Sequence, residues 1–191
     1  MGKKITGLDI AAYLIELGVG VNSPVSQLPL QKLVTLCQSK YVFDHDEKMF
    51  PDDVLAYHYG PVVGSVRKQY QRYGSNPIPF AGVELAPMPD NFFEVLTEVW
   101  ALFAPLGNKL VDVTHAVGPW SKYFIDEKHT CVIPADELGE AWNDYKIAAK
   151  SLSSKPGDAT PSTFCMPSAA AGEFEGIIES SRRQSHKLVM A

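Results

Sequence analysis

The feature that most constrains the fold is a wide apolar stripe between residues 90 and 103. Its apolar residues recur at steps of three and four: Phe92, Phe93, Leu96, Val99, Trp100 and Phe103. Glu94, Thr97 and Glu98 occupy the positions between them. This spacing matches the 3.6-residue turn of an α-helix and not the two-residue repeat of a strand. A stripe this wide needs cover, so we expect the most deeply buried helix of the protein here.

Two further helices are predicted near the N-terminus. Thr6 and Asp9 have the form of a capping box, and apolar residues follow at helical spacing as far as Leu17. A second helix starts after Ser26, with Pro29 in its first turn, where a missing N–H does no harm. Its expected apolar stripe is Leu30, Leu33, Val34, Cys37 and Tyr41. Gln31, Lys32, Gln38 and Lys40 lie mostly off that stripe.

The middle of the chain has a weaker pattern. Residues 49–51 and 54–57 are candidate extended pieces, enough for a small hairpin. Gly60-Pro61 is interpreted as the start of a helix, because proline fits the first helical position. The helical spacing continues through Val62, Val63, Val66, Tyr70 and Tyr73, and Gly74 ends it.

The later segments are again helical. A short helix is expected after Asn108, ended by Gly118-Pro119, and a last helix after Pro134. The stripe of the last helix is Leu138, Ala141, Trp142 and Tyr145. The pattern predicts a mainly α, compact multi-helix domain over residues 1–150, with at most a short β-hairpin. Residues 151–172 are interpreted as a Ser-, Pro-, Ala- and Gly-rich linker, and residues 173–191 as a C-terminal tail with a weak helical pattern.

Composition limits the classes of function. The 191 residues are 46% hydrophobic and 20% charged, as in globular proteins, and the net charge of -5 argues against a protein that coats nucleic acid. The three cysteines are widely spaced and suggest no disulfide framework. The apolar stretch near the N-terminus is too short to span a bilayer, so we expect a cytoplasmic protein without a membrane partner.

No common catalytic or metal-binding motif is present. The sequence has no His-Glu-x-x-His run, no Cys-x-x-Cys pair, no Gly-x-Ser-x-Gly elbow and no phosphate-binding glycine loop. We therefore expect no enzyme, no metal and no cofactor. The alternative is a metal-dependent hydrolase that uses His58 and His115 with an aspartate. A small nucleic-acid binder is a further alternative, because Arg67, Lys68 and Arg72 lie beside two tyrosines, although tyrosines turned inward explain the same spacing.

Several short stretches go beyond periodicity. They are Leu-Gln-Lys-Leu at residues 30–33, Tyr-Gly-Pro-Val at 59–62, Tyr-Gly-Ser-Asn-Pro-Ile at 73–78, and Thr-His at 114–115 followed by Pro-Trp at 119–120. Their order and separation resemble the Panacea antitoxin domain, also called SocA-like or GepA-like. The resemblance covers roughly residues 5 to 147. It departs from the family where Val34-Thr35 replace the usual aromatic residue.

The resemblance implies a mainly helical protein that neutralises a toxin encoded beside it. A member of the family acts as an adaptor that delivers its toxin to a bacterial protease, and others are associated with phages and mobile elements. We therefore expect an antitoxin-like protein that binds a cognate protein toxin stoichiometrically. The alternatives are a protease adaptor, with a bacterial protease as second partner, and a regulatory protein of a phage or mobile element. The oligomeric state is left open.

The residues of these motifs divide into two expected roles. Fold maintenance is favoured for residues that can tie turns together: Gln31, Lys32, Gly60, Pro61, His115 and Trp120. Partner contact is favoured for a His-Tyr pair beside a glycine turn and for the helix expected after it: His58, Tyr59, Arg67, Tyr70 and Arg72.

Overall fold

The computed structural model describes residues 4–153 and residue 176. The expected linker beyond residue 153, the tail and Cys165 therefore lie outside the described residues, apart from residue 176. The last described helix ends at Ser153, so residues 151–153, which we expected to open the linker, are helical.

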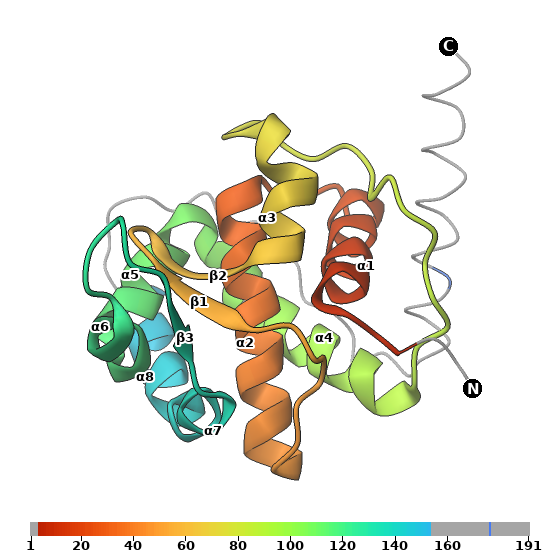
Figure 1. The fold of residues 1–191 in the computed structure, drawn as a ribbon. Helices are drawn as coiled ribbons and strands as arrows, with labels where there is room; N and C mark the ends of the chain where they lie inside the picture. Colours follow the sequence, from red (N-terminus) through yellow and green to blue (C-terminus); the bar gives the residue numbers. More distant parts are fainter. Residues whose placement is uncertain (1–3, 154–175, 177–191) are drawn as a thin grey trace.

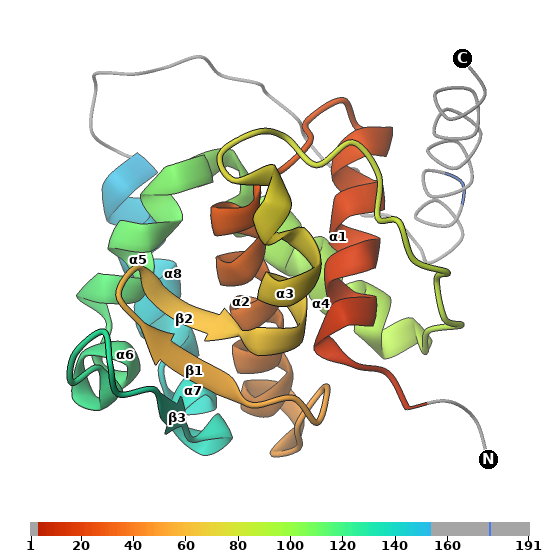
Figure 2. The same ribbon diagram turned by 45° about the horizontal axis from the view of Figure 1, so that its top comes forward.

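The described chain is mainly α-helical with a small antiparallel sheet, which confirms the predicted fold class. Figures 1 and 2 show the arrangement of these elements. In chain order they are α1 (Gly7–Gly20), α2 (Gln27–His45), β1 (Val54–Tyr57), β2 (Gly60–Val63), α3 (Gly64–Tyr70), a 3-10 turn (Gln71–Tyr73), α4 (Asp90–Phe103), a 3-10 segment (Ala104–Lys109), α5 (Leu110–Ala116), α6 (Gly118–Tyr123), β3 (Cys131–Ile133), α7 (Ala135–Glu140) and α8 (Trp142–Ser153).

Helix α2 is the centre of the molecule. It contacts α1, α4 and α7, and the strands β1 and β2 cross in front of it in Figure 1. Because neighbours surround its middle, several polar residues are buried together with its apolar stripe: Gln31, Lys32, Thr35, Gln38 and Ser39. Gln31, Lys32 and Gln38 lie off the predicted stripe and are nevertheless buried, which the spacing did not indicate. Gln38 meets the cost of burial by hydrogen bonding the backbone of residues 49 and 50.

The predicted stripe of α4 is buried along its length. Leu96 and Trp100 lie on the same covered side, as the spacing predicts. The capping box of α1 is also confirmed, since the Thr6 hydroxyl accepts from the backbone N–H of Asp9 and the Asp9 carboxylate accepts from the backbone N–H of Thr6. Cys37 is a buried core residue, and burial raises the pKa of its thiol.

Gly60-Pro61 does not start a helix. These two residues open β2, which pairs antiparallel with β1 in the register Val54↔Val63 to Tyr57↔Gly60. The helix that we expected from residue 61 begins only at Gly64. Val62 pairs with Leu55 of β1, the Val63 backbone N–H donates to Gln31 on α2, and both side chains are buried. Helical spacing alone does not distinguish this outcome from a helix.

A third strand completes the sheet in the order β2-β1-β3, with Val54 opposite Ile133. Near it, Gly118-Pro119 ends one helix but also begins the next, α6. The predicted last helix is divided into α7 and α8, and its predicted stripe is buried. Within residues 4–153, no helix has both the length and the apolar character needed to cross a membrane.

Candidate functional site

The site is built around the two-residue turn, His58-Tyr59, that joins β1 to β2. Helix α2 holds the strand that leaves this turn. The Lys32 Nζ donates to the Pro61 carbonyl at 3.0 Å, and the Gln31 Oε1 accepts from the Val63 backbone N–H at 2.9 Å. Two consecutive residues of α2 therefore fix two positions of β2 by directional contacts.

Lys32 is an unusual residue for this position, because its side chain is 0% exposed. No carboxylate among the described residues pairs with its amine. Burial disfavours the charged form and lowers the pKa of Lys32 to about 7. The amine is therefore divided between its neutral and charged forms near neutral pH.

Gly60 is fitted closely against the same amine. Its φ of +91° is a conformation that residues with a Cβ rarely adopt. A Cβ at this position would lie 2.8 Å from the Lys32 Nζ and 2.8 Å from the Thr114 Oγ1. Side chains of α2 and α5 thus pack against residue 60. Glycine is the residue that fits both the backbone angle and the space there.

The strand that enters the turn is held by a stack of rings. The Trp120 indole N–H donates to the Tyr57 carbonyl at 2.7 Å. The Trp120 ring stacks on His115 at 3.7 Å between centroids and on Phe124 at 5.1 Å. Burial, and then the charge of Lys32, lower the pKa of His115, and its Nε2 is buried without a hydrogen-bond partner.

The residues expected to maintain the fold therefore surround one turn. Lys32, Gln31 and Pro61 connect α2 to β2, and Trp120 connects α6 to β1. The sequence placed these residues in separate motifs along the chain. In the structure, these residues together support the turn formed by His58 and Tyr59.

The outer face of the turn is exposed. Tyr59 is 62% exposed, and its ring meets the His58 ring edge-on at 4.6 Å. His58 also contacts the Phe124 ring, and its Nδ1 lies 3.5 Å from the Glu127 Oε1. Ile125 is 66% exposed. Of the expected cations, Arg67 lies near the turn, with its guanidinium 5.6 Å from the Tyr57 ring.

We use the name turn surface for His58, Tyr59, Arg67, Ile125 and Glu127. A pocket of about 170 Å³ lies beside His58. It is lined by Ala56, Tyr57, His58, Asp126, Glu127 and Thr130. The turn surface therefore combines exposed aromatic and aliphatic side chains with a small, partly acidic hollow.

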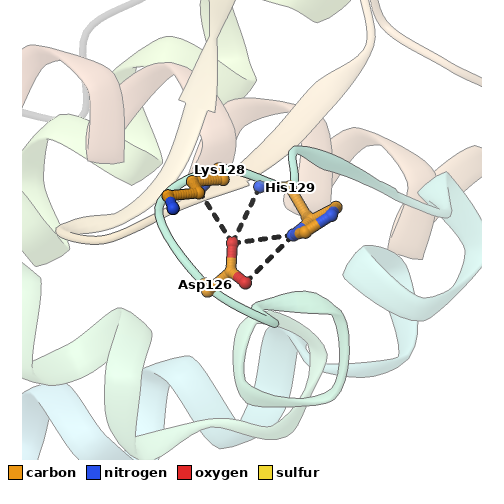
Figure 3. Close-up of polar contacts among 3 residues, drawn as sticks. All are labelled: Asp126, Lys128 and His129. Atoms are coloured by element: carbon orange, nitrogen blue, oxygen red, sulfur yellow. Dashed lines mark hydrogen bonds and ion pairs between the residues drawn. The ribbon is translucent and has the colours of Figure 1, made fainter.

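The acidic wall of this pocket has a fixed shape. The Asp126 carboxylate accepts from the backbone N–H groups of Lys128 and His129, at 2.7 and 3.0 Å, and lies 2.8 Å from the His129 Nδ1 (Figure 3). The contact with the His129 ring, and then these backbone contacts, lower the pKa of Asp126. The carboxylate is thereby held in its charged form, and the tight turn places Glu127 beside His58.

The other two expected contact residues lie elsewhere. Tyr70 is 1% exposed, and its hydroxyl donates to the Ala81 carbonyl at 2.8 Å, so its side chain is not presented to a partner. That expectation is corrected, because the chain after α3 folds back over the ring. Arg72 lies against the neighbouring Tyr73 ring in the 3-10 turn and makes no described contact with the turn surface.

Sequence reasoning missed Ile125 and Glu127 as parts of this surface, and Phe124 as a ring contact of His58. They follow α6 in a segment without periodic spacing, so no pattern indicated them. His58 and His115, the pair considered for a hydrolase, contact Glu127 and Trp120 respectively. Among residues 4–153, no group of three or more His, Cys, Asp or Glu side chains is arranged to hold a metal ion.

Comparison with protein-family models, with curated proteins and with solved structures found no match to this chain. Membership of the Panacea family therefore stays a prediction that depends on the motifs quoted above.

Proposed function

We propose that this chain is a cytoplasmic antitoxin-like protein, which binds a partner protein toxin at the turn surface and neutralises it by forming a stoichiometric complex. The chain acts by covering part of the toxin and needs no catalysis of its own. The observation that carries the proposal is an exposed aromatic turn on a rigid support. Tyr59 and His58 extend outward while Lys32, Gln31 and Trp120 fix the backbone beneath them.

Such a turn suits protein recognition for a physical reason. Binding energy at interfaces is concentrated in a few aromatic and arginine side chains. A side chain on a fixed backbone loses less conformational entropy on binding than one on a mobile loop. Tyr59 supplies an anchor of this kind, as do Arg67 beside the Tyr57 ring and the exposed Ile125, which follows Phe124 in the chain. A stable complex needs about 800 Å² from each partner, so the contact must extend beyond these residues.

The charge of the pocket adds a preference. Asp126 and Glu127 face a hollow large enough for one side chain. Complementary charge steers partners and fixes their orientation. We therefore expect the toxin to place a lysine or arginine in this pocket, with apolar residues against Tyr59 and Ile125.

The test is co-expression with the reading frame next to this gene. A toxin there arrests growth, and the wild-type chain restores growth and co-purifies with the toxin. Tyr59→Ala and Arg67→Ala should each lose protection while their melting temperatures stay unchanged. The matched control is Ile147→Ala on α8, because Ile147 is 63% exposed, almost the same as Tyr59, but lies on another element. Its protection should be unchanged.

Three outcomes would contradict parts of the proposal. If the neighbouring reading frame never arrests growth, it does not encode a toxin. If protection needs a functional host protease, the chain delivers the toxin to that protease and does not act by blocking alone. Normal protection by both turn variants, together with a hydrolytic activity lost in His58→Ala and His115→Ala, replaces the antitoxin by an enzyme.

A further inference from the structure

The support of the turn includes a titratable group. The Lys32 amine is fully buried, and its described hydrogen bond is the one to the Pro61 carbonyl. An ammonium has three N–H donors and carries a charge, whereas a neutral amine has two donors and an acceptor. The Nε2 of the preceding residue, Gln31, is a buried donor without a hydrogen-bond partner in the described part of the chain. The site is therefore short of acceptors before any further N–H is added.

The groups that face the amine do not compensate a positive charge. From β2 it meets the Gly60 backbone and the Pro61 carbonyl, which do not titrate. From α5, Thr114 is neutral, and the charge of Lys32 disfavours the charged form of His115. The nearest carboxylate on α5, Asp112, acts on His115 and is not a cause of the shift at Lys32. A charged Lys32 thus has no carboxylate partner among residues 4–153.

We propose that Lys32 makes the attachment of the hairpin turn to α2 pH-dependent: the neutral amine holds the turn, and protonation favours a state in which the turn lifts and the amine reaches water. Gly60 is the natural pivot. It follows the turn directly, packs on the amine, and has a positive φ that allows conformations closed to other residues.

The direction of the effect follows from the two protonation equilibria. In the lifted state the amine has its ordinary pKa of 10.5, and in the held state the pKa is about 7. Between pH 10.5 and pH 7 the lifted state therefore binds one proton more. As the pH falls through this interval, the ratio of held to lifted molecules falls up to tenfold per pH unit. Below pH 7 both states are protonated at Lys32, and the ratio no longer changes through this group.

The amide of Val63 reports directly on the attachment, because its N–H donates to Gln31 on α2. Hydrogen exchange at this amide is measured from pH 6.5 to 9 and corrected for the intrinsic dependence on pH. Amides in the middle of α4 report global unfolding in the same sample. We expect the opening constant at Val63 to exceed that of α4, and to rise severalfold per pH unit as the pH falls from 9 to 7.

Two matched variants assign the effect. Lys32→Met keeps the length of the side chain without its charge, and it should abolish the pH dependence at Val63. Lys40→Met makes the same change on the same helix. There the contacts with Asp44 and Glu98 outweigh burial and raise the pKa of the amine, so the slope at Val63 should remain. A slope that survives in Lys32→Met overturns the proposal.

A measurement on the unaltered protein covers the case in which Lys32→Met does not fold. The carbon next to the amine is followed by NMR through a pH titration of the folded chain. A midpoint near 7 is the expected result, and a midpoint near 10.5 overturns the proposal. So does exchange at Val63 that equals the exchange of α4 amides at every pH, because the turn then does not open by itself.

The consequence for toxin binding depends on the proposed function: the complex should weaken as the pH falls from 9 to 7. The two proposals fail separately. A pH-dependent turn without any toxin that binds it refutes the function alone. A toxin that binds Tyr59 with equal affinity at pH 7 and pH 9, with pH-independent exchange at Val63, refutes the switch alone.

Discussion

Helix α2 is held by two seams of different chemistry. Toward α4 the seam is mainly apolar, and Tyr41 packs edge-on against Phe92 at 5.0 Å between ring centroids. Its polar contacts, Lys40 with Glu98 and Asn91 with Tyr41, join side chains and not backbone groups. Toward the hairpin the seam is polar, because Gln31 and Lys32 bind the backbone of β2. Both seams are buried, yet only the polar one fixes individual backbone positions of a surface turn.

The difference separates stability from positioning. Apolar burial stabilises in proportion to the area removed from water and tolerates small shifts. A hydrogen bond contributes only about 0.5–1.5 kcal/mol net, but it demands a definite distance and direction. We infer that the α4 seam supplies most of the stability, while the hairpin seam holds the turn surface in one conformation. The following experiments test this division.

The largest loss of stability is expected where α4 packs into the core, with the Trp100 ring beside Gly18 of α1. Trp100→Ala should lower the free energy of unfolding by about 3–5 kcal/mol, since it empties a packed position. Denaturant unfolding measures the change. Leu102→Ala, on the same helix but partly exposed, is the control and should cost far less. Equal melting temperatures of Trp100→Ala and wild type would show that Trp100 is not a packed core residue.

A smaller but still clear loss is expected at the pivot of the polar seam. Gly60→Ala should cost about 2–4 kcal/mol, because the positive φ and the contacts at 2.8 Å both oppose a Cβ. The control is Gly118→Ala, where a Cβ meets nothing within 4 Å. Thermal and denaturant unfolding compare the two variants. Similar stability in both variants would show that residue 60 accommodates a Cβ and that its close packing against Lys32 and Thr114 contributes little.

The pH dependence of global stability distinguishes the seams again. The folded pKa of Lys32 is lowered, so the unfolded chain binds the extra proton above pH 7 and stability rises with pH there. Between pH 7 and pH 9, wild type should gain up to about 1.4 kcal/mol per pH unit relative to Lys32→Met. Below pH 7 the difference should be constant. Parallel curves for the two proteins would contradict a buried, titrating amine.

The smallest effect is expected where one hydrogen bond is removed and the packing is kept. Trp120→Phe retains a ring against His115 but loses the donor to the Tyr57 carbonyl. We expect a cost of about 1 kcal/mol and faster hydrogen exchange in the hairpin, with α4 amides little affected. A uniform increase of exchange across the chain would show that the two seams are not separable.

Part of the candidate site was predictable from the sequence. A His-Tyr pair before a glycine indicated an exposed turn, and the motif residues Gln31, Lys32, Gly60 and Trp120, expected to maintain the fold, do pack around that turn. Which backbone groups they bind could not be predicted, because these contacts join residues such as 32 and 61, or 57 and 120, that are distant in sequence. Tyr70 was misassigned for the same reason, since the segment that covers it reaches Ala81.

The sequence by itself determined the local elements whose apolar spacing or capping is strong. The apolar stripe of α4 and the capping box of α1 are examples, because they depend on helical geometry over a few residues. Only the tertiary structure decided that Gly60-Pro61 begins a strand and that Lys32 is buried. Periodicity shows which side of a helix prefers cover, but it does not show whether a distant segment covers the other side as well. For α2 that segment is the hairpin, which covers Lys32. The buried Lys32 amine then donates to β2 and supports the exposed turn.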